Sequence, residues 1–179
     1  MLALDRQMMT AHGLAMRLVE ASMDDLSPLT DAGFEVVIQP VSTCYVPDIT
    51  AMYREVARVT ADHGLYISQH KQPVSLQADA QFSTGGYALR EPYHRQGPLP
   101  VVTGSAHRET GAAEFLHRWE DLLGGLCRSG FVIEDLVEPR HADPSAAPGT
   151  FEHRSAYAPP YVTVKARRTA GSQAKLWTP

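Results

Sequence analysis

Residues Phe34 to Ser68 have the sequence FEVVIQPVSTCYVPDITAMYREVARVTADHGLYIS, and this stretch decides the fold. Two short apolar runs, FEVVIQPV and LYIS, flank a segment from Ile49 to Asp62 whose apolar residues recur with the period of a helix. Asp48 is placed to cap the start of this helix and Gly64 to end it. The pattern predicts a strand–helix–strand unit whose two strands are parallel.

A parallel pair of strands is buried on both faces, so we expect a sheet with helices on both sides. In such α/β sheets, ligands bind beyond the carboxyl ends of the strands. Here those ends are Gln39 to Tyr45 after the first strand and Gln69 to Gln72 after the second. The sequence therefore predicts a binding site formed by these two segments.

Composition narrows the class of protein. The 179 residues, 44% of them hydrophobic, suit one globular domain. The formal charge of −4, with acidic and basic residues interspersed, gives no basic surface for nucleic acid or anionic membrane. We therefore expect a small-molecule partner, and neither nucleic acid nor membrane.

No apolar stretch approaches the roughly 20 residues that span a bilayer, and the first residues lack the layout of a signal peptide, so we expect a cytoplasmic protein. The two cysteines, Cys44 and Cys127, are too few for a disulfide framework and are interpreted as small buried apolar residues. The eight histidines show no spacing typical of metal ligands, so no metal site is expected.

The remaining chain gives weaker patterns. The expected elements are a helix over Met1–His12 ended by Gly13, a strand over Leu14–Ala21, a helix over Ala112–Ser129 ended by Gly130, a strand over Phe131–Glu138, a loop over Pro139–Ala158 and a half-exposed antiparallel strand over Tyr161–Arg167. Trp119 and the leucines near it are interpreted as core. We expect one domain over residues 1–168 and a flexible tail over 169–179.

Residues 69–111 have no sustained period and are rich in Gly, Pro, Gln and His. Loops of this length inside a domain are usually functional or disordered, and the aromatic residues Phe82, Tyr87 and Tyr93 argue against disorder. We expect a lid or substrate-facing insertion, with short hairpin strands around Tyr87–Leu89 and Val101–Thr103.

The order of these elements and several strings resemble the class I S-adenosylmethionine-dependent methyltransferases of the small-molecule type 11 kind. FEVVIQPVSTCYVPD is similar to that family's strand four and the turn after it, and ITAMYREVARVTADHGLYIS to its next helix and strand five. VEASMDDL resembles the segment after strand three, and SGFVIEDLVEP and YVTVKAR resemble strands six and seven. The resemblance implies an α/β, Rossmann-like three-layer sandwich, with a mostly parallel sheet in the order 3-2-1-4-5-7-6 and an antiparallel strand near the carboxyl end.

The resemblance also implies S-adenosylmethionine as the cofactor and a small molecule as the methyl acceptor. The family's glycine-rich loop and the acidic residue that binds the ribose have no counterpart, and MLALDRQMM resembles the helix after strand two. We therefore expect an N-terminally truncated methyltransferase that binds S-adenosylmethionine weakly or not at all. The strand over Leu14–Ala21 would lack its usual neighbour, so we expect it to pair with Phe34–Ile38, or another chain to cover this edge in a homo-oligomer.

The resemblance implies six cofactor-binding residues, of which five are considered first. Ser22 stands where the family has the Asp that accepts from the adenine amino group, and Met23 supplies the adjacent backbone amide. Asp24, with Asp25, either takes over the acceptor role or caps the following turn. Gln39 and Pro40 follow strand four, where the family's backbone contacts the methionine part; the alternative for them is an ordinary strand-to-helix turn.

Tyr45 takes the place before VPD that faces the methyl group in the family, or else it packs on the start of the helix. The sequence does not fix a catalytic residue; Tyr45 and His70 are the candidates. Lys71, His94 and His107 could serve as bases or bind an acidic substrate, and for each of them and His70 the alternative is a solvated loop residue. The competing functions are a non-catalytic methyltransferase-like partner that completes another chain, and an inactive truncated product.

Overall fold

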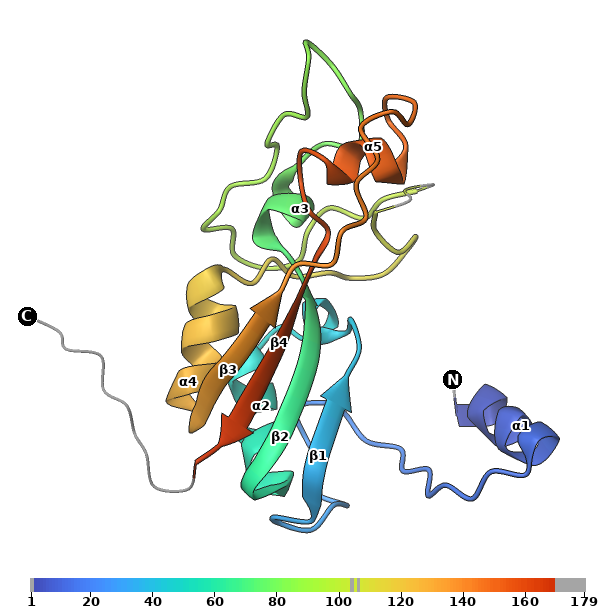
Figure 1. Ribbon diagram of the computed structural model, residues 1–179, viewed down its shortest axis with the longest axis vertical. Coiled ribbons are helices and arrows are strands. Elements are labelled where there is room, and N and C mark those ends of the chain that lie inside the picture. The colour runs from blue at the N-terminus through green and yellow to red at the C-terminus, as the bar shows by residue number, and fades with distance from the viewer. Residues whose placement is uncertain (1, 104, 106, 170–179) are drawn as a thin grey trace, which may run out of the picture.

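The computed structural model describes residues 2–103, 105 and 107–169. The elements in chain order are α1 (Leu2–His12), β1 (Phe34–Gln39), a 3₁₀ turn η1 (Thr43–Tyr45), α2 (Ile49–Val59), β2 (Thr60–Lys71), α3 (Pro73–Gln77), a π-helical turn η2 (Glu120–Gly124), α4 (Gly125–Arg128), β3 (Phe131–Val137), α5 (Phe151–Ser155) and β4 (Tyr161–Arg168). Four strands form one twisted sheet in the order β1-β2-β4-β3, with α2 and α4 beside it (Figure 1).

The predicted strand–helix–strand unit is confirmed. β1 and β2 run parallel, with Val36 opposite Leu65 and Ile38 opposite Ile67. β4 is antiparallel to both β2 and β3, so the order β1-β2-β4-β3 reproduces the 4-5-7-6 half of the expected sheet. The α/β, Rossmann-like class is correct, but the sheet in the described residues is mixed rather than mostly parallel, because two of its three pairings are antiparallel.

The helix α2 forms for the predicted reasons, but it ends earlier than predicted. The carboxylate of Asp48 accepts hydrogen bonds from the backbone amides of Thr50 and Ala51, at 2.9 and 3.0 Å. The helix ends at Val59, and β2 already begins at Thr60, where it pairs with Phe34. Gly64 lies inside β2 and does not end the helix; a Cβ there would lie 3.1 Å from the Glu35 carbonyl oxygen.

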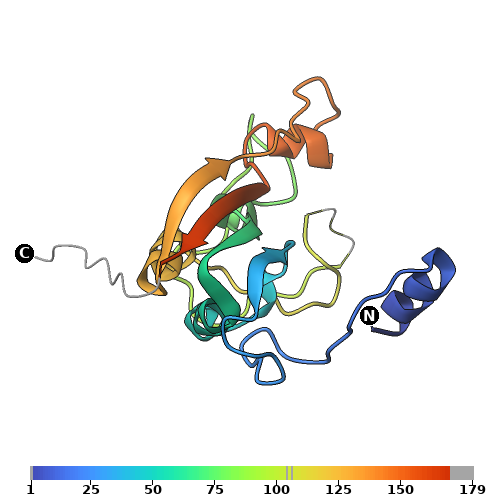
Figure 2. The same ribbon diagram turned by 60° about the horizontal axis from the view of Figure 1, so that its bottom comes forward.

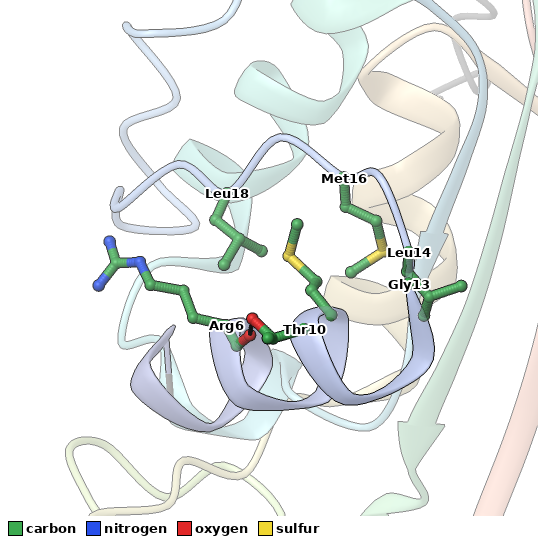
Figure 3. Close-up of a pocket in the computed structure, with 7 residues that line it drawn as sticks. Arg6, Thr10, Gly13, Leu14, Met16 and Leu18 are labelled. Carbon is green, nitrogen blue, oxygen red and sulfur yellow. Dashed lines mark hydrogen bonds between the residues drawn. The ribbon is translucent and has the colours of Figure 1, made fainter.

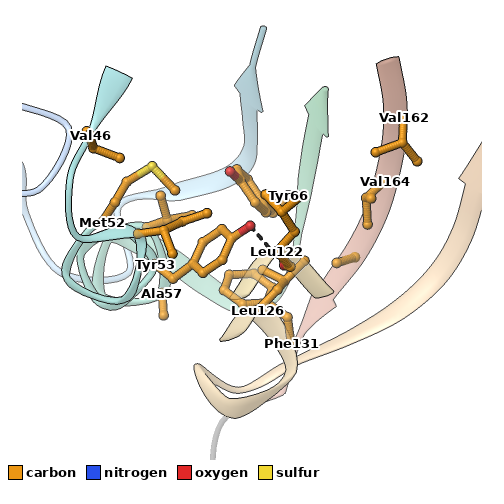
Figure 4. Packing of buried hydrophobic residues seen from close by; sticks show 13 residues of the cluster. Val46, Met52, Tyr53, Ala57, Tyr66, Leu122, Leu126, Phe131, Val162 and Val164 are labelled. Carbon is orange, nitrogen blue, oxygen red and sulfur yellow. Dashed lines mark hydrogen bonds between the residues drawn. The ribbon is translucent and has the colours of Figure 1, made fainter. Parts of the chain in front are cut away.

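The main core lies between the sheet and the helices α2 and α4 (Figure 4). Tyr53 of α2 packs edge-on against Tyr66 of β2, and Tyr66 packs against Phe131 at the start of β3. The Tyr53 hydroxyl donates to the Leu122 carbonyl oxygen at 3.0 Å, which ties α2 to η2. Trp119 packs against this core, as expected.

The opposite face of the sheet is open, which contradicts the expectation of helices on both sides. Its apolar side chains remain accessible to solvent, with Val36 50% and Ile38 70% exposed. On the same face, the Glu134 carboxylate pairs with Lys165 and Arg167. Because α2 and α4 share one face and α1 lies apart from the sheet in both views, no described helix covers this side (Figures 1 and 2).

The predicted strand over Leu14–Ala21 is wrong: these residues form no regular element, and they pair neither with β1 nor with any other described segment. A strand forms only where a neighbour satisfies its backbone donors and acceptors, and none runs beside it here. The helix before it, α1, forms as predicted and ends at Gly13, whose φ is +62°. None of the residues of α1 is buried.

Four further boundaries differ from the prediction. The helix expected from Ala112 begins only at about Trp119, and Phe115 instead makes an isolated bridge with Pro98. The loop expected over Pro139–Ala158 contains α5. After Ser68, β2 continues to Lys71 and α3 follows. The expected hairpin strands reduce to isolated bridges such as Ala78 with Leu89, and Val101–Thr103 forms no strand; the tail over 170–179 lies outside the described residues.

Candidate functional site

The turn at residues 22–25 is held against α2 and the end of β1. Its backbone closes through a hydrogen bond of 3.1 Å from the Asp25 amide to the Ser22 carbonyl oxygen. Further along, Arg58 of α2 donates to the carbonyl oxygens of Leu26 and Leu29, and Glu55 accepts from the Leu26 amide. These contacts position the turn although the preceding residues have no regular structure.

Gln39 joins the turn to the end of β1. Its side-chain nitrogen lies 3.3 Å from the sulfur of Met23 and donates to the Ser42 hydroxyl at 3.0 Å. Its side-chain oxygen accepts from the Tyr66 hydroxyl. The Ser42 hydroxyl in turn donates to the carbonyl oxygen of Pro40 at 2.9 Å. The amide of Gln39 is therefore turned into the protein, and the structure brings Met23, Gln39 and Pro40 together.

In this turn Ser22 is exposed and Asp24 is half-buried. The Ser22 hydroxyl donates to the Asp24 carboxylate, and the Asp25 carboxylate accepts from the Ser27 amide. Asp25 thus caps the next turn, which is one of the two roles considered for it. Within the described part of the chain, the hydrogen bond from Ser22 engages only one of the two carboxylate oxygens of Asp24.

Tyr45 lies at the end of η1, with its ring next to the end of β2. The ammonium nitrogen of Lys71 is 5.9 Å from the centre of this ring. Burial, together with a hydrogen bond to Glu109, raises the pKa of the Tyr45 hydroxyl well above its ordinary value. Tyr45 is therefore a neutral phenol at pH 7, which suits hydrogen bonding better than proton abstraction.

His70, the second catalytic candidate, is completely buried in β2. Its Nδ1 lies 3.0 Å from the Thr43 hydroxyl and its Nε2 lies 2.8 Å from the Ser68 hydroxyl. Burial, with a smaller contribution from His117, lowers the pKa of His70 to about 4. His70 is therefore a neutral imidazole, and both of its ring nitrogens have hydrogen-bond partners. It supports η1 through Thr43, and its buried side chain is not exposed at the carboxyl edge of the sheet.

Cys44, in the middle of η1, is buried as predicted, whereas Cys127 is half-buried. Burial raises the pKa of the Cys44 thiol to about 11, so this thiol stays protonated at neutral pH. The described residues contain no group of three or more His, Cys, Asp or Glu side chains that could hold a metal ion. Among the helices described, none is both long and apolar enough to cross a membrane.

A buried ion cluster continues the site past β2. The fully buried carboxylate of Glu114 binds the ammonium group of Lys71 through one oxygen and the guanidinium group of Arg108 through the other. Lys71 was a candidate from sequence, but Glu114 and Arg108 were not, since nothing in their local pattern marks them. His107 lies next to this cluster, whereas His94 is exposed and contacts Arg118.

One cavity lies away from this site. About 620 Å³ opens between α1 and the segment after it, lined by residues such as Arg6, Met9, Leu14 and Met16 (Figure 3). None of the predicted site residues borders it. Its walls belong to the part of the chain that stands apart from the sheet, so it does not form part of the candidate site.

Comparison with known proteins agrees with this architecture. Residues 1–68 match the family described as "Methyltransferase domain". A 140-residue stretch, 76% of this chain and 55% of the relative, is 30% identical to the "Uncharacterized methyltransferase YbaJ" of Bacillus subtilis (strain 168). The chain thus spans about half the length of this curated relative.

Solved structures share the fold. A S-adenosylmethionine-dependent methyltransferase from Mesorhizobium loti superposes with a TM-score of 0.71 at 23% identity, over 94% of this chain and 76% of that one. A geranyl diphosphate C-methyltransferase from Streptomyces coelicolor A3(2) was solved with Mg²⁺, geranyl diphosphate and S-adenosyl-L-homocysteine. It superposes with a TM-score of 0.54 at 17% identity, over 92% of this chain and 56% of that one. Residues 1–68 are similar to the methyltransferase domain family, and the chain has the fold of the class I S-adenosylmethionine-dependent methyltransferases.

Proposed function

We propose that this chain carries out, in the cytoplasm, the transfer of a methyl group from S-adenosylmethionine to a small-molecule acceptor. One observation supports the proposal above the others. Met23 and Gln39 meet at the carboxyl end of β1, and Tyr45 lies beside Lys71 at the carboxyl end of β2; this is the edge at which α/β sheets bind ligands, in a chain with a methyltransferase fold.

The residues present fit the two ends of the cofactor. Ser22 and Asp24 offer hydroxyl and carboxylate acceptors for an adenine amino group, and a carboxylate is the stronger hydrogen-bond acceptor of the two. Since the Gln39 amide is engaged inside the protein, the backbone of Gln39 and Pro40 is what remains for the methionine end. We assign no residue of this chain to the ribose.

When bound, the cofactor supplies an electrophilic methyl group on a sulfonium. The main requirement on the protein is then to align the acceptor atom with that methyl group. Tyr45 is the residue that we assign to this task, because its neutral hydroxyl lies at the edge of the site. We assign to His70 the role of holding η1, and therefore Tyr45, in position through Thr43.

The test is an NMR titration with S-adenosylhomocysteine, because chemical shifts also detect the weak binding expected here. Amide shifts should concentrate at residues 22–24, 39 and 45. Tyr45→Phe should lower methyl transfer without moving the shifts at 22–24, while the exposed Tyr157→Phe should change neither. Absence of shifts at 22–24 with millimolar ligand would contradict the proposal.

A second candidate is a non-catalytic partner that associates through its sheet edge. The exposed apolar residues of β1, together with exposed Leu4, Met8 and Leu14, favour association with a second copy of the chain. Light scattering on the purified chain tests this directly. A monomer at tens of micromolar disfavours this candidate, whereas a dimer that dissociates on Ile38→Lys supports it.

A further inference from the structure

A second cavity, of about 480 Å³, lies beyond the carboxyl end of β2, between α3, α5 and the loops that precede α4. Three arginines line it, Arg90, Arg108 and Arg154, and His107 lies beside them. Two carboxylates, Asp79 and Glu91, also face it. The balance of charge on its wall therefore depends on which of these groups are already paired.

Both carboxylates of the wall have partners. Asp79 pairs with Arg90 at 2.9 Å, and Glu91 pairs with Arg95 at 2.7 Å. The lining arginines that neither of these carboxylates pairs with are Arg108 and Arg154. Arg108 pairs with Glu114, but Glu114 also carries Lys71, so one buried negative charge serves two positive ones.

Arg154 is only 1% exposed and has no carboxylate partner among the described residues. Its guanidinium group donates to neutral oxygens: the hydroxyl and carbonyl of Ser75, and the carbonyls of Ala78 and Asp79. The charge of Asp79 acts on Arg154, but Asp79 is already paired with Arg90, and a buried cation without a counter-charge of its own is costly. The cavity wall thus carries more positive than negative charge.

Two nitrogens at this wall also lack a partner. Arg108 Nη2 and His107 Nδ1 are buried and make no hydrogen bond within the described part of the chain. Buried polar atoms are nearly always satisfied, and leaving a charged donor unsatisfied is especially unfavourable. A group that accepts hydrogen bonds and carries negative charge would satisfy both conditions at once.

The titration of His107 reflects the same positive field. Burial is the largest cause that lowers its pKa to about 4, and the charges of Arg154 and Lys71 lower it further. Glu152 acts in the opposite direction without cancelling them. His107 is therefore neutral at pH 7, and the positive charge of the wall comes from the arginines and Lys71.

The cavity is linked to the edge where the methyl group would be transferred. Arg108 on its wall binds Glu114, Glu114 binds Lys71, and the ammonium of Lys71 lies over the ring of Tyr45. Only two side chains, Glu114 and Lys71, separate the cavity wall from Tyr45. This arrangement places the cavity on the acceptor side of the proposed site.

We infer that the cavity binds an anionic group of the methyl acceptor, a carboxylate or a phosphate, with Arg108 as its direct ligand and Arg154 as a source of positive charge. The inference rests on the proposed methyltransferase function in one respect, namely that the anionic ligand is the methyl acceptor. A purely structural role accounts for Arg154, which holds the end of α3. It does not account for the unpaired Arg108 Nη2 or for the excess charge.

The test is isothermal titration with inorganic phosphate at pH 7.5 and constant ionic strength. The wild-type chain should bind one phosphate saturably. Arg108→Gln should weaken binding by about tenfold or more, as expected for loss of a charge-assisted hydrogen bond. Arg54→Gln, on the exposed side of α2, is the matched control and should leave the affinity unchanged.

Absence of saturable phosphate binding, or equal affinity in wild type and Arg108→Gln, overturns the inference. Should Arg108→Gln fail to fold, amide shifts of the wild type with phosphate decide: they must concentrate at residues 105, 107–108 and 154, and shifts elsewhere overturn it.

Titration with S-adenosylhomocysteine separates this inference from the proposed function. Shifts at residues 22–24 without phosphate binding retain the methyltransferase proposal and overturn the anion site. Phosphate binding without S-adenosylhomocysteine shifts at residues 22–24 supports the anion site and contradicts methyl transfer at this edge.

Discussion

Glu114 offers the sharpest test of the buried ion cluster. Its side chain is 0% exposed and carries both Lys71 and Arg108, which are 8% and 11% exposed. Glu114→Gln keeps the size of the side chain and removes the only negative charge that these two cations share in the described structure. Removing one partner of a buried ion pair costs about 3–5 kcal/mol, because the other charge stays buried and unpaired.

For a chain of this size, each kcal/mol lowers the melting temperature by roughly 2–4 °C, so we expect Glu114→Gln to melt about 6–20 °C below wild type. Urea unfolding followed by circular dichroism measures the free energy directly. Glu120→Gln is the matched control: Glu120 pairs with Arg118 at 3.0 Å but is 64% exposed, so its loss should cost under about 1 kcal/mol.

A double variant sharpens the reasoning. In the Glu114→Gln background, Lys71→Met removes one of the two stranded cations and should recover part of the lost stability. Equal costs for Glu114→Gln and Glu120→Gln would refute the view that the cluster is a buried network. If adding Lys71→Met to Glu114→Gln lowers the free energy of unfolding again by as much as Glu114→Gln did, the claim that Lys71 depends on Glu114 is refuted.

Three further outcomes follow from single contacts. Asp48→Ala removes the cap of α2 and should cost about 1 kcal/mol in urea unfolding. Tyr53→Phe leaves the buried Leu122 carbonyl without its donor and should cost about 1–2 kcal/mol, measured the same way. The pKa of His70 is about 4 in the folded protein and roughly 6.5 in the unfolded chain, so between these pH values the unfolded chain binds more protons. The contribution of His70 to stability should therefore be complete above pH 6.5 and fall by roughly 2–3 kcal/mol toward pH 4. His70→Asn should flatten this part of the plot of unfolding free energy against pH.

Local patterns were sufficient for the centre of the fold. The apolar spacing on α2 and the acceptor at Asp48 act within one helix, so the sequence around them predicts the helix and its start. The two apolar runs beside it are strands that pair with each other, and β2, the inner of the two, also pairs with β4. The same reasoning placed Gln39 and Tyr45 at the ligand-binding edge, since parallel strands end on the same side, whereas Met23 came from the family resemblance.

Boundaries that depend on distant partners could not be predicted in this way. Gly64 suits a helix end locally, but the close approach of the Glu35 carbonyl from the neighbouring strand places it inside β2. The segment over Leu14–Ala21 has the composition of a strand and lacks a neighbour to pair with. Glu114 binds Lys71 across 43 positions of sequence, and no local pattern signals such a contact.

The two sides of the proposed site are built in different ways, and this difference has a functional consequence. On the cofactor side, Ser22 and Asp24 lie on a partly exposed turn; Glu55 and Arg58 of α2 hold it through the backbone of Leu26, and Met23 packs it against the core. On the acceptor side, Arg108 is fixed by a buried carboxylate. Substitutions on the exposed turn therefore act on binding with little effect on folding, whereas substitutions of the buried charges act on both. A loss of activity can thus be attributed to binding only on the cofactor side, and on the acceptor side it must be separated from stability by direct measurement of anion affinity.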